Sequence, residues 1–460
     1  MKKSNLFLTL AIASCVLVTS CKEDVEEIQL DESGQVKEIA SGKVTNPETF
    51  AQLSPEQNKE KLEDDGLTLL SNMEDLSESS AVSVSASFVS FLDRAMVAPG
   101  NGRLAATSRT LKRLGNGTAS AHDIFATLRT AEEEPESIQD FYDQYSGVWS
   151  WNAEKEDWDF QAKGDKIIFE FPSTENGMQN NAQYIVHSYE GLSQDHPYEG
   201  YKGDLPTKIL AELTVDGKQQ VAYSFNASYN KDGEPAQLTT SLSVNSFLFT
   251  AITDNNTEKV GVKYALKRDN KTLLAMGSGA YGNFSSDYIL SLENQEEVHE
   301  GDVVNRVDAY FQLMNVVVAG DMDIKKYLDG VENNYQEGYY DSETQEYESG
   351  YYIDSVTEQN AQLLEKAFNL KVFYADGSGK IADTEVYTYT DTEIYYSGYY
   401  DQEKREYIDK EKEVEYQVMD VRMVFEDKSK ADLETYFSEG FDDLVKEFEK
   451  FAKELEEDLG

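Results

Sequence analysis

The chain is poor in positive charge, in cysteine and in histidine. Lysine and arginine number 41 against 87 acidic residues, which gives a formal net charge of −46 at pH 7. Nucleic acids and anionic membrane surfaces are bound through basic patches, so this charge excludes both as broad partners. Hydrophobic residues make up 40% of the chain, which is typical of a globular protein rather than a disordered one.

Residue types that build catalytic or metal sites are scarce too. The four histidines, which show no i,i+4 or other metal-ligand spacing, are His122, His187, His196 and His299. The chain also has no G-x-S-x-G motif for a serine nucleophile. Acidic pairs are so frequent that none stands out, and a glycosidase with two carboxylates therefore stays an alternative. The sequence predicts no catalytic residue, no metal site and no cofactor.

Two short motifs match known binding loops only in part. The stretch DGSGK at 376–380 lacks the rest of a phosphate-binding loop and predicts a hairpin turn. The stretch DMDIKKYLDG at 321–330 begins like a calcium loop, but Lys325 and Lys326 replace expected ligands and the glycine is misplaced. We therefore predict no ligand site at either motif.

Long uncharged apolar runs are absent, which excludes a membrane-spanning helix by sequence. The N-terminal apolar run at 6–18 follows Lys2 and Lys3 and is too short to cross a bilayer, so it is typical of a secretory signal. Small residues at 18–20 precede Cys21, and this stretch resembles a bacterial lipobox, in which the thiol takes a diacylglycerol. We expect lipid attachment at Cys21; the alternative is an ordinary cleaved signal. With Cys15 removed, the fold would depend on its core alone, without disulfides.

The residues that follow, Lys22, Glu23 and Asp24, resemble the surface-export signal of lipoproteins in one Gram-negative phylum, a lysine followed by two acids. Together with SPEQNKEKLE at 54–63, WSWN at 149–152 and the stretch 425–449, they look like a large group of uncharacterised surface lipoproteins from that phylum. The resemblance implies a location, the outer membrane with the body facing the exterior, and it implies no activity. This chain departs from the group at Lys428, where several members carry glycine.

Pattern changes along the chain predict six segments. They are a signal peptide at 1–20, an acidic tether at 21–53, a helical region at 54–135, an antiparallel β domain at 136–320, a tyrosine-rich β region at 321–428 and a C-terminal amphipathic helix at 429–460. Ser54 as N-cap and Pro55 in the first turn predict where the first helix begins. The next stretch, 79–96, fits a helix but also alternates like a strand.

A cluster of basic residues interrupts the helical region. Its members are Arg94, Arg103, Arg109, Lys112, Arg113 and Arg129. One interpretation is a site for an anionic ligand or a lipid headgroup. We favour the other, in which the segment docks on acidic surface of the same protein.

From about residue 146 apolar and polar residues alternate, with turn pairs such as Asp216-Gly217 between the runs. The fold class expected is α+β, with a large antiparallel β-meander that has one apolar face and one small, polar, solvated face. A cover for the apolar face is expected from the C-terminal helix, which places apolar residues at steps of three and four. These residues are Leu433, Phe437, Phe441, Leu444, Phe448, Phe451, Leu455 and Leu459.

One aromatic unit occurs three times. The pairs of aromatics that six residues separate are Trp151 and Trp158, Tyr340 and Tyr347, and Tyr400 and Tyr407. A four-residue hairpin loop would place the members of each pair opposite one another, and would place Trp149 opposite Phe160. Asn152 and its counterparts Asp341 and Asp401 would bond to the turn backbone. The last loop residue, which is Glu156, Gln345 or Arg405, would need a left-handed backbone that glycine adopts more easily.

About half of the 29 tyrosines lie between Tyr335 and Tyr416. Exposed rows of tyrosine or tryptophan suit stacking on sugar rings, although aromatics are also ordinary strand formers. The candidate ligand-binding aromatics are therefore Trp149, Trp151, Trp158, Tyr340, Tyr347, Tyr400 and Tyr407. The function expected is a lipid-anchored, non-catalytic surface module whose partners are the membrane and a polysaccharide or an envelope protein. The alternatives are a carrier of an acyl chain in a curved sheet and a glycan-degrading enzyme.

Overall fold

The structure is a computed structural model, and it places most of the chain after residue 48. The described residues are 49–97, 138–193, 204–231, 233–292, 300–334, 339–341, 346–348, 354–401, 404–438 and 440–459.

Three helices precede the first strand of the described chain, four lie among the strands between β10 and β15, and two follow the last strand. The helices are α2 (Pro55–Ser77), α3 (Ser80–Val97), α6 (Ile138–Tyr145), α7 (Ser286–Leu292), α8 (Glu300–Val303), α9 (Ile324–Asn334), α10 (Asp354–Ala367), α11 (Leu433–Ser438) and α12 (Asp442–Leu459). The first strands are β1 (Gly147–Asn152), β2 (Asp157–Gln161), β3 (Ile167–Phe171), β4 (Ala182–Leu192), β5 (Leu205–Val215), β6 (Lys218–Tyr229), β7 (Pro235–Val244), β8 (Phe247–Asn255) and β9 (Lys259–Arg268). The later strands are β10 (Lys271–Gly282), β11 (Val304–Leu313), β12 (Val316–Asp323), β13 (Tyr339–Asp341), β14 (Glu346–Glu348), β15 (Phe368–Tyr374), β16 (Lys380–Asp401), β17 (Glu406–Val424) and β18 (Lys430–Asp432).

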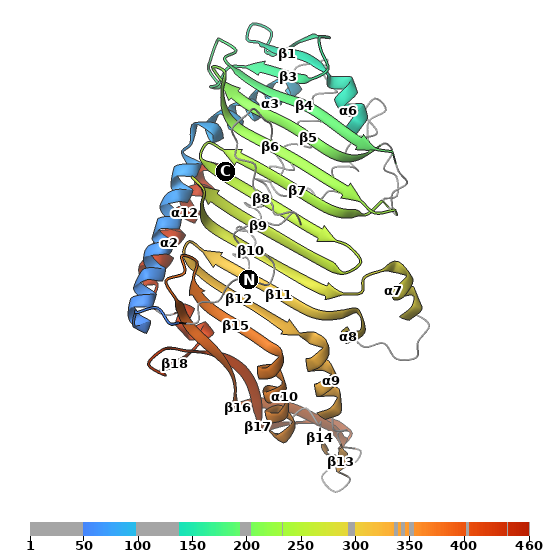
Figure 1. The fold of residues 1–460 in the computed structure, drawn as a ribbon, viewed down its shortest axis with the longest axis vertical. Helices are drawn as coiled ribbons and strands as arrows, with labels where there is room; N and C mark the ends of the chain where they lie inside the picture. The colour runs from blue at the N-terminus through green and yellow to red at the C-terminus, as the bar shows by residue number, and fades with distance from the viewer. Residues whose placement is uncertain are drawn as a thin grey trace.

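One sheet dominates the fold (Figure 1). In the described part of the chain it has 16 strands in the order β18-β17-β16-β15-β12-β11-β10-β9-β8-β7-β6-β5-β4-β3-β1-β2. Neighbouring strands are antiparallel, apart from β1 and β3, which pair in parallel. The predicted α+β fold with a large β-meander is therefore confirmed. Because β12 pairs with β15, the boundary expected at residue 320 is not a break in the sheet.

The two faces of the meander differ as the alternation predicted. One cross-strand row on the apolar face runs through Phe225, Thr240, Ala251, Tyr264, Met276 and Phe311. The neighbouring row on the other face runs through Ser224, Ser241, Thr250, Ala265, Ala275 and Gln312. Successive strand residues point to opposite faces, so the residues of a row share one face.

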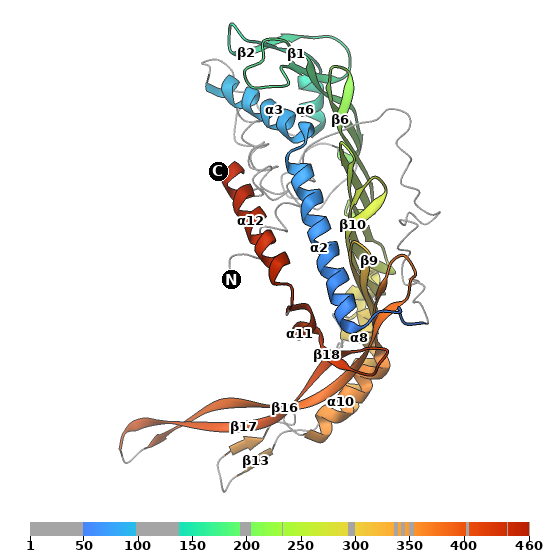
Figure 2. The same cartoon turned by 90° about the vertical axis from the view of Figure 1, so that its left-hand side faces the viewer.

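Helix α2 begins as its sequence predicted. The Ser54 hydroxyl accepts a hydrogen bond from the Gln57 backbone N–H at 3.3 Å, and the Gln57 side chain accepts one from the Ser54 N–H at 2.9 Å. This reciprocal capping box satisfies two amide groups that the first turn would otherwise leave unpaired. Figure 2 shows α2 lying lengthwise along the apolar face, across the direction of the strands.

The ambiguous stretch after α2 is a helix, α3. Its buried apolar residues recur at steps of three and four, and they are Ala81, Val84, Phe88, Phe91 and Leu92. A strand would place Val82 on the same face as the buried Val84, but Val82 is 41% exposed. The helical period prevails because it buries more apolar surface against the sheet.

The C-terminal segment differs from the single helix expected over 429–460. It contains the short strand β18, the helix α11 and then α12, with Gly440 in the left-handed region at φ +80° just before α12. Figure 2 shows α2 between α12 and the sheet. A Cβ at Gly66 in α2 would lie 2.5 Å from Cδ2 of Leu444 in α12, so the absent side chain permits this close helix contact.

Strands β16 and β17 project from the sheet as a long arm (Figure 2). Strand β15 pairs with β16 only as far as Asp383. The β16–β17 pairing continues to the Asp401–Glu406 pair, so most of the arm is a two-stranded ribbon.

A buried hydrogen bond fixes the start of α2 to the sheet. Asn58 is 2% exposed, and its Oδ1 accepts a hydrogen bond from the Tyr374 hydroxyl at 2.6 Å. Burial raises the pKa of Tyr374 to about 12, so the phenol is a neutral donor at physiological pH.

We predict that Asn58→Ala lowers the free energy of unfolding by about 1–3 kcal/mol, because it leaves the buried Tyr374 hydroxyl without its acceptor. Adding Tyr374→Phe to that variant should cost less than the two single substitutions together, since the unpaired hydroxyl is then removed. Urea unfolding of the four proteins measures this. Strict additivity would show that the hydrogen bond contributes nothing.

Candidate functional site

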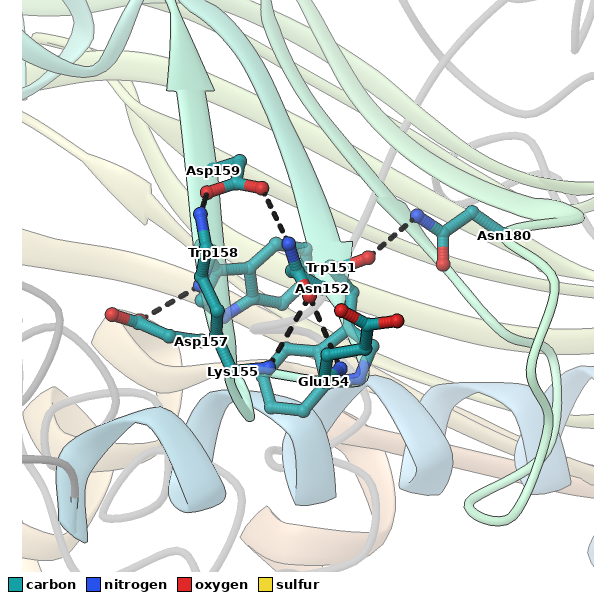
Figure 3. Close-up of polar contacts among 8 residues, drawn as sticks. All are labelled: Trp151, Asn152, Glu154, Lys155, Asp157, Trp158, Asp159 and Asn180. Atoms are coloured by element: carbon teal, nitrogen blue, oxygen red, sulfur yellow. Dashed lines mark hydrogen bonds and ion pairs between the residues drawn. The ribbon is translucent and has the colours of Figure 1, made fainter.

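The first aromatic hairpin has the register that the sequence predicted. Trp151 pairs with Trp158, and Trp149 pairs with Phe160. Figure 3 shows the Asn152 side chain directed at the turn, where its Oδ1 accepts from the N–H groups of Glu154 at 3.1 Å and Lys155 at 3.2 Å. These two hydrogen bonds to the Asn152 side chain stabilise the reversal of the chain in the loop.

The strain expected at the end of the loop is also present. Glu156 has φ +51°, and Arg405, its counterpart in the third hairpin, has φ +58°. Two side-chain hydrogen bonds connect the first hairpin to Asp159 of β2. Asn152 Nδ2 donates to Oδ2 of Asp159 at 2.7 Å, and Lys155 Nζ donates to its Oδ1 at 2.5 Å. These bonds, first from Asn152 and then from Lys155, lower the pKa of Asp159.

The tryptophans of this hairpin belong to the core. Trp151 and Trp158 are each 6% exposed and meet edge to face at 5.5 Å between ring centroids. Phe91 of α3 lies 4.9 Å from Trp151, and Phe88 lies 6.4 Å from Trp158. Neither indole is available to stack on a sugar, so these two candidate ligand-binding residues are structural.

The outer pair of the same ladder is less enclosed. Trp149 is partly buried and donates its Nε1–H to the Tyr145 carbonyl at 3.0 Å. Phe160 is 44% exposed and lies 4.4 Å from the Trp149 ring. This pair ends the core ladder at the sheet edge.

The second and third hairpins have the predicted backbone register as well. Tyr340 pairs with Tyr347, and Tyr400 pairs with Tyr407. The side chains of these four tyrosines lie outside what the structure describes, so their role as ligand-binding aromatics stays a prediction.

Several other predicted residues fall outside the described ranges. They are Cys21, Lys22, Glu23, Asp24, Arg103, Arg109, Lys112, Arg113, Arg129, His122, His196 and His299. Of the basic cluster, Arg94 is described, and it donates to the Glu175 carbonyl at 3.0 Å and approaches the Glu175 carboxylate at 3.7 Å. That residue docks on its own protein, as we favoured for the cluster.

The partial motifs have structural roles. Asp323 accepts a hydrogen bond from the Lys326 N–H at 2.9 Å and so caps α9, and Asp376 accepts one from the Ser378 N–H at 2.8 Å in the β15–β16 turn.

His187 lies between two charged side chains. Its Nδ1 is 2.9 Å from Lys166 Nζ, and its Nε2 is 2.8 Å from Glu212 Oε1. Among the described residues no group of three or more His, Cys, Asp or Glu side chains is arranged to hold a metal ion.

A cluster on the polar face of β10 and β11 was not predicted from the sequence. Tyr281, Arg306, Asp308 and Tyr310 lie there beside glycines of β10. The Tyr281 hydroxyl donates to Asp308 Oδ2 at 3.0 Å, and the Arg306 guanidinium lies 4.4 Å from the Tyr281 ring centroid. The one sequence signal for this cluster is the alternation of glycine at 277 and 279 inside a strand, which marks close approach of other groups.

Comparisons of the chain with protein-family models, with curated proteins and with solved structures found no match. Over the part of the chain that the structure describes, no helix has both the length and the apolar content needed to span a bilayer.

We predict that Glu156→Gly raises the free energy of unfolding by up to about 1 kcal/mol, because glycine adopts the left-handed backbone of that position without strain. The matched control is Glu154→Gly in the same loop, whose backbone does not have positive φ and which should gain nothing. Thermal unfolding of both variants checks the difference. A stability loss in Glu156→Gly would mean that the side chain matters more than the backbone strain.

Proposed function

We propose that the protein is a lipid-anchored, non-catalytic binding protein of the bacterial outer membrane, attached through Cys21 and exposed at the cell surface. The lipobox-like residues before Cys21 and the export-like triplet Lys22, Glu23 and Asp24 support the anchor and the location. The strong negative charge supports a partner other than nucleic acid or an anionic membrane surface.

The observation that carries the binding role is the single-layered sheet. Figure 1 shows β5–β10 face-on, with none of the described helices in front of these strands. The helices α2 and α12 lie behind them, on the apolar face (Figure 2). A broad, polar face built on strands is a rigid surface, and rigid surfaces bind extended ligands with little loss of conformational entropy.

The apolar face favours one alternative function, a carrier of an acyl chain or another apolar ligand. Tyr264 and Phe311 are each 43% exposed and Met276 is 37% exposed, although all three lie on the face that α2 partly covers. Their cross-strand pairing makes them one contiguous patch. Contiguous exposed apolar patches mark binding surfaces more often than scattered apolar residues do.

For the anchor, we predict that Cys21→Ala moves the protein from the membrane fraction to the soluble fraction, because the acyl chains are its expected membrane attachment. Replacing Lys22, Glu23 and Asp24 together by alanine should leave the protein in the membrane fraction but protected from protease added to intact cells. Fractionation, protease accessibility and mass spectrometry of the N-terminal peptide measure these outcomes. An unmodified Cys21 peptide would refute the anchor.

For the carrier, organic extraction of the Cys21→Ala protein should release lipid, since that variant has no acyl chains of its own to confuse the result. Substituting aspartate for both Tyr264 and Phe311 should empty the extract, because an apolar ligand would have to bury the two carboxylates. Lipid analysis by mass spectrometry gives the readout. An empty extract from the Cys21→Ala protein counts against a carrier.

A further inference from the structure

The polar face of β9–β11 contains an aromatic surface that rests on bare backbone. Gly277 of β10 pairs directly with Tyr310 of β11. A Cβ at Gly277 would lie 2.7 Å from Cε1 and 3.0 Å from Cζ of the Tyr310 ring. The ring therefore lies over the glycine, with one side against the backbone of β10.

The cross-strand neighbours of this ring are small. On the other side of Tyr310, its cross-strand partner is Ala319 of β12, and Ala275 and Gly279 flank Gly277 on β10. No long side chain lies directly beside the ring on either neighbouring strand. Tyr310 is partly exposed.

Hydrogen-bonding groups line one end of this surface. Asp308 precedes Tyr310 on the same face, and its Oδ2 accepts from the Tyr281 hydroxyl at 3.0 Å and lies 3.6 Å from Arg306 Nη2. The Tyr281 ring in turn contacts the Arg306 guanidinium. The Nε of Arg306 is buried and has no hydrogen-bond partner among the described residues. The carboxylate and the guanidinium are thus held in place on the same face of β11 as Tyr310.

This combination is chemically suited to a sugar. A pyranose has an apolar C–H face, which stacks on an aromatic ring, and an equatorial rim of hydroxyls, which donate to carboxylates and accept from guanidinium groups. In a small-molecule site, a few polar groups around an apolar contact fix the orientation of the ligand. An anionic sugar is disfavoured, since Asp321 of β12 pairs directly with Asp308.

We propose that Tyr310, Asp308 and Arg306 form a binding site for a neutral pyranose unit of a polysaccharide, with Tyr310 as the stacking surface. The site deepens the proposed function, on which it rests, by naming the class of ligand. Burial raises the pKa of Tyr310 to about 12, so the side chain carries no negative charge at physiological pH.

A purely structural role is the competing account, because an aromatic ring over a strand glycine also stabilises the sheet. Three substitutions separate the two accounts. Tyr310→Phe keeps the ring over Gly277, whereas Tyr310→Ala removes it. Tyr389→Ala is the matched control, since it removes an exposed tyrosine ring from strand β16, far from β11 in the order of the sheet.

The test is affinity electrophoresis of the full chain, in nonionic detergent, through native gels that contain starch, xyloglucan, laminarin or β-mannan. Retardation by at least one of these neutral polysaccharides is expected. In that gel Tyr310→Ala should bind about tenfold more weakly, the loss expected for one aromatic stacking contact, while Tyr310→Phe and Tyr389→Ala should stay close to the parent protein. No retardation by any of the four, or equal retardation of Tyr310→Ala, would overturn the proposal.

A second measurement uses the parent protein, in case Tyr310→Ala does not fold. Glycine amides labelled with ¹⁵N should shift at Gly277 and Gly279 when an oligosaccharide of the retarding polymer is added, while Gly66 in α2 should not. Unchanged amides at both strand glycines would refute the site. Neither failure affects the anchor, because lipidation at Cys21 and surface exposure are measured without any glycan.

Discussion

The fold depends on helix α2, which packs on the apolar face of the single-layered sheet. A sheet with one apolar face must bury that face against another element, and α2 supplies apolar side chains to each of the three core clusters. Leu62 packs in the cluster beneath α11, Leu69 and Met73 pack on the middle strands, and Leu76 reaches the aromatic cluster of α3. Each strand of the meander hydrogen-bonds to its neighbours in the sheet, and α2 packs against strands that lie far apart in that order.

The local features of this fold could be predicted from sequence because their causes are local. Ser54 and Gln57 form their capping box within one turn, and Asn152 closes its own hairpin. The register of Trp151 opposite Trp158 follows from loop length alone. Lys428, in the turn between β17 and β18, has φ +69°, which is the backbone that glycine adopts without strain.

The burial of the same residues could not be predicted, because it depends on elements far away in the chain. The hairpin pattern fixed which aromatics face each other, but whether Trp151 was core or surface depended on where α3 packed. The C-terminal apolar stripe indicated an amphipathic helix, yet nothing in the stripe showed that α12 would pack on α2 at Gly66. The polar cluster was hidden for the same reason, since Gly277 and Tyr310 become neighbours only through the β10–β11 register.

The large negative charge also has a structural use in the arm. A two-stranded ribbon leaves backbone N–H groups unpaired along its edges, where they could pair with other chains. Three such groups bond to acidic side chains: Val386 N–H donates to Glu365 at 2.6 Å, Thr392 N–H to Asp391 at 2.8 Å and Val421 N–H to Asp420 at 2.7 Å. Each carboxylate accepts a hydrogen bond from an edge N–H group and places a negative charge at that edge. A second copy of the same acidic arm is therefore repelled by an edge with which it could otherwise pair. The acidity of the chain thus disfavours self-association through the edges of the arm.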